Sequence, residues 1–219
     1  MKKTFCLFIT LIVLMNFSIA QKTTIGIQAG ATFASYKATI ENLSATSKTK
    51  VGFTAGLALS APLGKNFSFR PELNFVQKGG KYNEEGYSDK LMLNYIELPL
   101  NFVYNTSSFH NGFFIGAGPS FNVGLSGKDK WKDGSESGED DIKFGSDGDY
   151  DFKALEIGLN VLAGYQFSGG FFIAANYNAG LNDISLENAG ENTKYHNRYF
   201  GIRIGYMFNG SIKAGSESK

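Results

Sequence analysis

The fold of this chain is limited most strongly by an alternation of apolar with small or polar residues, which recurs eight times after residue 20. A period of two is typical of β-strands, whose successive side chains point to opposite faces. The segments have roughly the 9–11 residues that a tilted strand needs to cross a lipid bilayer. They are 24–34, 51–61, 67–75, 93–104, 112–125, 154–167, 171–181 and 199–208.

The connections between these segments differ in length. The short ones are 62–66, 105–111 and 168–170, and the long ones are 35–50, 78–92, 126–153 and 182–198. Short turns at one end and long loops at the other are typical of a transmembrane β-barrel. The sequence therefore predicts an all-β fold, an eight-stranded antiparallel up-and-down transmembrane β-barrel over residues 21–208. A polar tail, 209–219, follows it.

The second face of each segment indicates which side points inward. A soluble exported barrel of the lipocalin kind, with an apolar ligand inside, would expose this second face to water. Glycine weakens strands, so a water-exposed face has no reason to be rich in it. The interior of an eight-stranded barrel is only wide enough for side chains to fill, so small residues are favoured there. The glycines on this face include Gly26, Gly30, Gly52, Gly56, Gly116, Gly118, Gly158 and Gly164.

The charged residues within the segments share the parity of the glycines. They are Arg70, Glu72, Glu97, Glu156 and Arg203, with the amides Asn74, Asn101, Asn176 and Asn178. An arginine facing lipid at mid-membrane costs ~2–4 kcal/mol, so the register that turns both arginines inward is strongly preferred. We expect an interior network in which the two arginines pair with the three glutamates, because guanidinium groups suit carboxylates.

Three prolines fall inside the segments: Pro71, Pro99 and Pro119. Each removes one hydrogen bond of the strand ladder, and we expect bulges or local kinks there. Aromatic residues near the segment ends fit the girdles that mark membrane interfaces. They are Phe67, Tyr95, Tyr104, Phe121, Tyr165, Phe167, Tyr199 and Tyr206.

The first twenty residues have the form of a secretory signal peptide: two lysines, an apolar run and a small residue before Gln21. We expect cleavage after Ala20, with a retained anchor as the alternative. Cys6 lies within the apolar run and not at its end, so lipidation is not expected. Without Lys2 and Lys3 the basic residues fall from 21 to 19 against 20 acidic ones, a balance that does not suggest nucleic-acid binding.

Four stretches carry a resemblance to a known family: FRPELNFVQKGG, NYIELPLNFVY, FFIGAGPSFNVG and, in the last segment, GIRIGYMF. Together they resemble the small outer-membrane β-barrels of Bacteroidota, the PorT-like or outer membrane protein beta-barrel domain group. The resemblance implies an eight-stranded barrel similar to OmpX and the membrane domain of OmpA, located in the outer membrane. It implies no single activity. Phe208 resembles the terminal aromatic of such barrels, although the polar tail follows it.

We expect a non-enzymatic protein with a plugged polar lumen and a structural, adhesive or envelope-machinery accessory role. A lumen of eight strands has no room for a solute channel. The alternatives are the lipocalin-like barrel and a lipid or peptide hydrolase at the barrel rim. Asp183, Ser185 and His196 share one loop and are the candidates for such a site, without a strained nucleophile motif; His110 lies in a short turn.

The connection 126–153 is rich in acidic residues, and the candidates for loose divalent-ion binding are Asp140, Asp141, Asp147, Asp149 and Asp151. An EF-hand spacing from Asp147 fails, because Phe152 stands where glycine is needed and Gly158 where glutamate is needed. A solvated loop is the default interpretation. No cofactor is expected, and the expected partners are outer-membrane lipid, lipopolysaccharide and an envelope protein.

Overall fold

The computed structural model describes residues 23–40, 43–107, 111–146, 150–186 and 193–208. Several predictions fall outside these residues: the signal segment 1–20, the tail 209–219, His110, Asp147 and Asp149.

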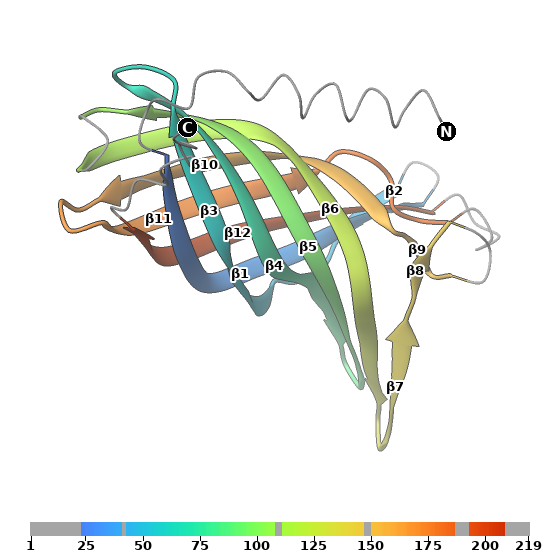
Figure 1. Cartoon of the computed structure of the whole chain (residues 1–219). Coiled ribbons are helices and arrows are strands. Elements are labelled where there is room, and N and C mark those ends of the chain that lie inside the picture. Colours follow the sequence, from blue (N-terminus) through green and yellow to red (C-terminus); the bar gives the residue numbers. More distant parts are fainter. Residues whose placement is uncertain (1–22, 41–42, 108–110, 147–149, 187–192, 209–219) are drawn as a thin grey trace, which may run out of the picture.

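All regular structure in the described residues is β (Figure 1). The strands are β1 (Thr24–Ile40), β2 (Leu43–Thr46), β3 (Lys50–Pro62), β4 (Phe67–Glu84), β5 (Tyr87–Asn105), β6 (Gly112–Asp133), β7 (Glu136–Ile142), β8 (Phe144–Gly145), β9 (Phe152–Lys153), β10 (Leu155–Gln166), β11 (Phe171–Gly180) and β12 (Thr193–Phe208). A helix of the length and apolarity needed to span a bilayer does not occur in this part of the chain.

The main sheet closes on itself. Ten described strands belong to it. β2 pairs only with β1 and β7 only with β6, so the other eight form the wall of the barrel. These pair antiparallel in the order β1, β3, β4, β5, β6, β10, β11 and β12, and β12 returns to β1 with Ile25 opposite Phe208. The prediction of an all-β, antiparallel up-and-down barrel is confirmed.

The apolar parity of the strands lies on the outside of the barrel. Phe113 and Ile204 are 66% and 65% exposed, whereas Gln28 and Glu97 on the other parity are 5% and 0% exposed. An apolar face turned outward suits lipid and is the reverse of what a lipocalin-like pocket needs. The lipocalin alternative is therefore wrong.

Inward glycines allow the strands to lie close together. A Cβ added to Gly30 would lie 2.0 Å from the carbonyl oxygen of Ile202, and one on Gly118 would lie 2.0 Å from that of Leu100. These contacts are with backbone and not with movable side chains. The tight coiling of a small barrel thus requires residues without a side chain at these positions.

The bulges predicted at the prolines are not found there. Pro71 lies opposite Leu100, and pairing resumes at Asn74 opposite Glu97 in the same register. A strand held on both sides can lose one ladder hydrogen bond, because neighbouring pairs keep its register. The register shift recorded among these strands lies elsewhere: Asn94 of β5 pairs with Ser126 but Tyr95 pairs with Gly124, which makes Leu125 of β6 the extra residue.

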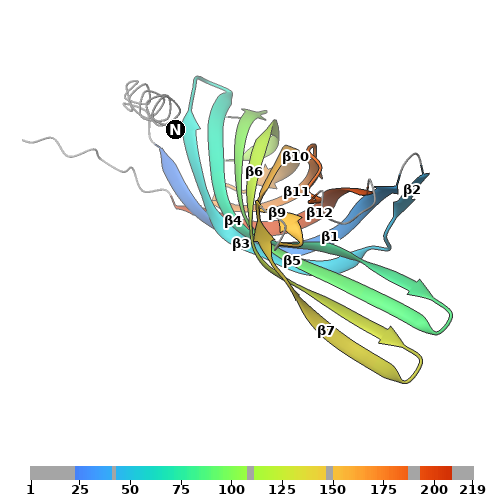
Figure 2. The same ribbon diagram turned by 90° about the vertical axis from the view of Figure 1, so that its right-hand side faces the viewer.

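Strands β4 to β7 continue past the closed barrel as two hairpins joined side by side (Figure 2). We call residues 79–84, 87–94, 126–133 and 136–142 the distal sheet, since it lies at the end opposite the short turns. Gly86 and Gly134 have φ angles of 85° and 57° at its two-residue turns, a region that favours glycine. The interpretation of 78–92 and 126–153 as loops was therefore wrong for most of their length.

The close contacts between strands predict that a methyl group added at an inward glycine destabilises the barrel. Gly118→Ala should lower the free energy of unfolding by ~1–3 kcal/mol, because the added carbon meets a backbone carbonyl. The measurement is urea-induced unfolding of the refolded barrel in detergent. Gly169→Ala is the matched control, since a Cβ there would have nothing within 4 Å. Equal midpoints for the two variants would contradict the explanation.

Candidate functional site

Glu72 is the centre of one cluster of charges in the lumen. Its Oε2 accepts hydrogen bonds from Nη1 of Arg203 at 2.6 Å, from Nε2 of Gln28 at 2.9 Å and from Nδ2 of Asn74 at 3.1 Å. Nε of Arg70 lies 3.5 Å from Oε1 of the same carboxylate. The structure thus places two guanidinium groups on a single glutamate.

Lys78 is the centre of a second cluster. Its ammonium group lies 2.6 Å from Oε1 of Glu156 and 3.6 Å from Oε2 of Glu97. The other oxygen of each carboxylate is also bonded: Asn197 donates to Glu156 at 2.7 Å, and the hydroxyl of Tyr199 donates to Glu97 at 2.7 Å. A cation and further hydrogen-bond donors thus replace much of the hydration that each carboxylate loses on burial.

The expected pairing of both arginines with three glutamates is therefore only partly correct. Glu97 and Glu156 pair with Lys78, a residue that the sequence analysis did not single out. Lys78 has the same parity as Arg70 and Glu72 on β4, and continuing the inward count along that strand would have found it. With Lys78 included, the three cations of the two clusters balance three carboxylates.

Amides link strands β5, β10, β11 and β12 inside the barrel. Asn160 of β10 donates to Asn101 of β5 at 2.9 Å, and Asn176 of β11 donates to Asn160 at 3.1 Å. Asn176 also donates to the hydroxyl of Tyr199 on β12 at 3.2 Å, which links the amides to Glu97. This polar layer crosses the lumen from one side to the other.

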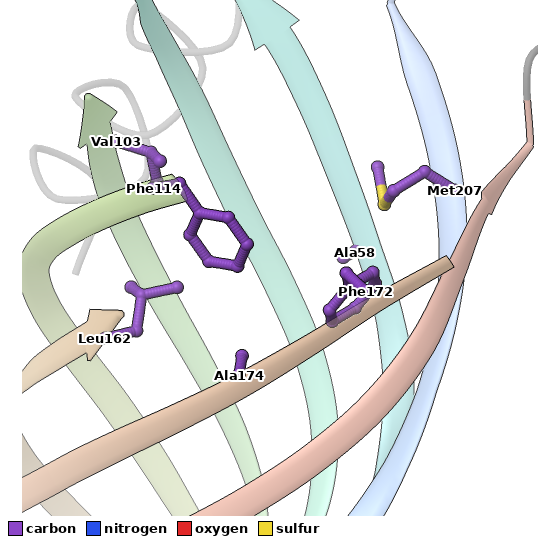
Figure 3. Packing of buried hydrophobic residues seen from close by; sticks show 7 residues of the cluster. All are labelled: Ala58, Val103, Phe114, Leu162, Phe172, Ala174 and Met207. Atoms are coloured by element: carbon purple, nitrogen blue, oxygen red, sulfur yellow. The ribbon is translucent and has the colours of Figure 1, made fainter. Parts of the chain in front are cut away.

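Apolar clusters lie on either side of the polar layer along the barrel axis. The proximal cluster, near the short turns, consists of Ala58, Val103, Phe114, Leu162, Phe172, Ala174 and Met207 (Figure 3). The distal cluster has Leu91, Leu93, Tyr95, Phe152 and Ile184 at its centre. The guanidinium of Arg70 lies 4.6 Å from the ring centre of Phe172, and a cation over an aromatic face is stabilised there.

Two of the predicted girdle aromatics lie inside the barrel. Tyr95 is 0% and Tyr199 is 2% exposed, and both hydroxyls are hydrogen-bonded in the lumen. Their position near strand ends suggested an interface, but their parity matches that of the inward charges. In contrast, Phe67 and Tyr104 pack edge to face on the outside of the barrel, with ring centres 5.2 Å apart.

The candidate hydrolase residues do not form a catalytic arrangement. The hydroxyl of Ser185 donates to Asp183 at 2.7 Å, and Asp183 also accepts the backbone N–H of Tyr195 at 2.9 Å. His196 lies opposite Lys37 on the outward parity of β12, whereas Tyr195 and Ser185 line an inner cavity. Asp183 thus stabilises a turn, and in the described part of the loop the hydrogen bonds of Ser185 go to Asp183 and not to a histidine.

The distal sheet separates its charges by face. Its inward face carries Tyr82, Glu84, Tyr87, Asp89, Asp129, Trp131, Asp133, Glu136 and Asp140. Its outward face carries Lys81, Lys90, Lys128, Lys130, Lys132, Glu139 and Asp141. Burial, together with the adjacent carboxyl of Asp89, raises the pKa of Asp129 to about 7. The charged residues named on the inward face are acidic, and most of those on the outward face are basic.

Of the acidic residues proposed for divalent ions, the three that the structure describes, Asp140, Asp141 and Asp151, do not converge. Asp140 accepts a hydrogen bond from Nε1 of Trp131 at 3.2 Å on the inward face, whereas Asp141 lies 3.8 Å from Lys128 on the outward face. Asp151 accepts the backbone N–H of Lys143 at 2.7 Å. Within the described ranges, no three His, Cys, Asp or Glu side chains are grouped to hold a metal ion.

Several solved barrels are similar to this chain. Ail, the attachment invasion locus protein of Yersinia pestis, is 14% identical with a TM-score of 0.43, over 86% of this chain and 100% of that one. Neisserial surface protein A is 15% identical with a TM-score of 0.44, over 86% and 100%. The N-terminal barrel domain of Pseudomonas aeruginosa OprF is 10% identical with a TM-score of 0.34, over 84% and 97%.

No curated protein matches the chain. A family model described as the outer membrane protein beta-barrel domain matches residues 4–186, which is most of the sequence. This match agrees with the closed barrel, its apolar exterior and its polar inward face. The chain belongs to the outer membrane protein beta-barrel domain family and is an outer-membrane protein.

Proposed function

We propose that this protein is a non-conducting, non-enzymatic barrel that holds the distal sheet at the cell surface in a structural or adhesive role, or as an accessory to an envelope assembly. The observation that carries the proposal is the filled lumen. Charges, amides and two apolar clusters occupy it in layers, and buried Glu97 and Glu156 share one lysine. A solute would have to break this network to pass.

The distal sheet is the part that can meet other molecules. An even number of strands puts both ends of the barrel chain on the short-turn side, which we assign to the periplasm, so the distal sheet faces outward from the cell. It is built as paired strands from Tyr87 opposite Asp133 down to the barrel. A sheet of this kind presents its side chains in a fixed arrangement, which suits binding or mechanical contact better than catalysis.

Export and subfamily are further parts of the proposal. The signal segment would bring the chain to the periplasm with cleavage after Ala20. The four stretches that resemble the PorT-like group of Bacteroidota favour an accessory role in an envelope machine.

Electrical recordings test the filled lumen. The refolded protein in a planar lipid bilayer should give no conductance steps, because a lumen of eight strands is filled by side chains. Insertion is checked by the altered gel mobility of the folded form before and after boiling, and a general porin serves as the positive control. Regular steps that disappear with boiled protein would overturn the proposal.

The lumen charges predict that the loss of Lys78 strongly destabilises the barrel. Lys78→Met should lower the free energy of unfolding by ~3–5 kcal/mol, because it leaves two buried carboxylates without their cation. Adding Glu156→Gln should restore part of the loss. The matched control is Lys128→Met, whose side chain is 48% exposed, and it should lower the urea midpoint much less, because solvent screens an exposed ion pair. Equal urea midpoints for Lys78→Met and the control would contradict the role of the network.

A further inference from the structure

A row of four lysines crosses adjacent strands at the base of the distal sheet. Lys48 forms a bridge with Lys81, Lys81 lies opposite Lys90, and Lys90 lies opposite Lys130. Like charges directly opposite each other destabilise a sheet. We call Lys48, Lys81, Lys90 and Lys130 the lysine row.

The protein itself neutralises only one end of this row. Glu139 lies opposite Lys130 and forms ion pairs with Lys130 and Lys128. Within the described residues, no acidic side chain lies within ion-pair distance of Lys81 or Lys90. The acidic residues of the same sheet lie on its inward face. An external anion would therefore relieve the repulsion within the row.

The lysine row lies on the side of the barrel that faces lipid. On β4 its parity continues from Phe75 through Gln77 and Gly79 to Lys81, and on β5 it continues from Ile96 through Asn94 to Lys90. The row therefore follows the apolar band of the barrel on the same outward surface. This is the position of lipid headgroups relative to the acyl chains.

A groove lies between the apolar band and the lysine row. It has a volume of about 510 Å³ and combines apolar with charged side chains. Its apolar lining includes Met92, Leu125, Phe144 and Tyr150. Lys128 and Lys143 contribute cations, and Asp141 contributes one carboxylate, which lies 3.8 Å from Lys128. The groove thus offers apolar contact and positive charge within one site.

We propose that the groove and the lysine row bind a phosphate-bearing lipid of the outer leaflet. Acyl chains pack against Met92 and Leu125, and the phosphate groups contact Lys81, Lys90 and Lys128. A soluble polyanion would gain nothing from the apolar lining, and the near-neutral chain has no general attraction for one. The inference rests on the proposed orientation of the barrel, with the distal sheet outside the cell.

This site differs from the loose divalent-ion binding expected for the acidic residues of 126–153. The outward face of the sheet instead offers ammonium groups, which can bind phosphate directly without a metal ion.

Lipid retention tests the proposal. Wild-type protein is reconstituted in phosphatidylcholine nanodiscs that contain a small fraction of lipid A, either phosphorylated or dephosphorylated, and retained lipid is measured by native mass spectrometry. The wild type should retain the phosphorylated form preferentially. Lys81→Gln/Lys90→Gln should reduce that retention about 30-fold, from the effect of two lysines at an anionic membrane surface.

The control variant is Lys65→Gln/Lys132→Gln, which removes the same charge. Lys65 lies in a turn at the other end of the barrel, and Lys132 lies one row further from the membrane, opposite Ser88. It should retain lipid like the wild type. An equal loss in both variants, or no preference of the wild type for phosphorylated lipid, would overturn the site.

A different measurement shows whether the protein is a membrane barrel at all. Protein that does not insert would lack the gel mobility shift of a folded barrel and would not assemble into the nanodiscs. An inserted barrel that binds both lipids equally overturns only the lipid site and leaves the proposed function intact.

Discussion

The structure depends on the burial of opposite charges inside the barrel. Each carboxylate of the two clusters has a cation on another strand: Glu72 meets Arg203, and Glu97 and Glu156 meet Lys78. A shift of one strand by one residue would turn these charges toward lipid and leave their partners buried and unpaired. The strand register, the closure of the barrel and the plugged lumen that we propose therefore share one electrostatic cause.

The alternation that builds the barrel does not stop at the membrane. On β5 it continues from Tyr95 and Leu93 to Asp89 on the inward side, and from Ile96 to Lys90 on the outward side. In the distal sheet many of the alternating residues are charged. The same period of two therefore separates a positive from a negative face there, and no longer an apolar from a polar one. The alternation that orients the barrel in lipid thus also gives the distal sheet one mostly basic face and one mostly acidic face.

The errors of the sequence interpretation have a common origin. The sequence of the distal sheet resembles that of loops because both of its faces are polar, so the hydrophobic contrast disappears although the period of two remains. Lys78 was missed because it stands beyond the last apolar residues of its segment. Tyr95 and Tyr199 were assigned to the interface from their place along the strand, whereas parity decides whether a side chain enters the lumen. The prolines do not shift the register, because the pairs on either side of them hold it.

The sequence alone determined the eight strands, their antiparallel order and the inward direction of Arg70, Glu72 and Arg203, because alternation and the cost of charges in lipid are local properties of each segment. Which carboxylate meets which cation was decided only by the tertiary structure, since the partners lie on different strands around a closed cylinder. The direction of the lysines on β6 was also decided there. The extra residue Leu125 reverses the parity of that strand, so Lys128 and Lys130 point outward beside Met92 and Lys90. Such a shift is set by pairing with the neighbouring strand, which a single segment of sequence does not contain.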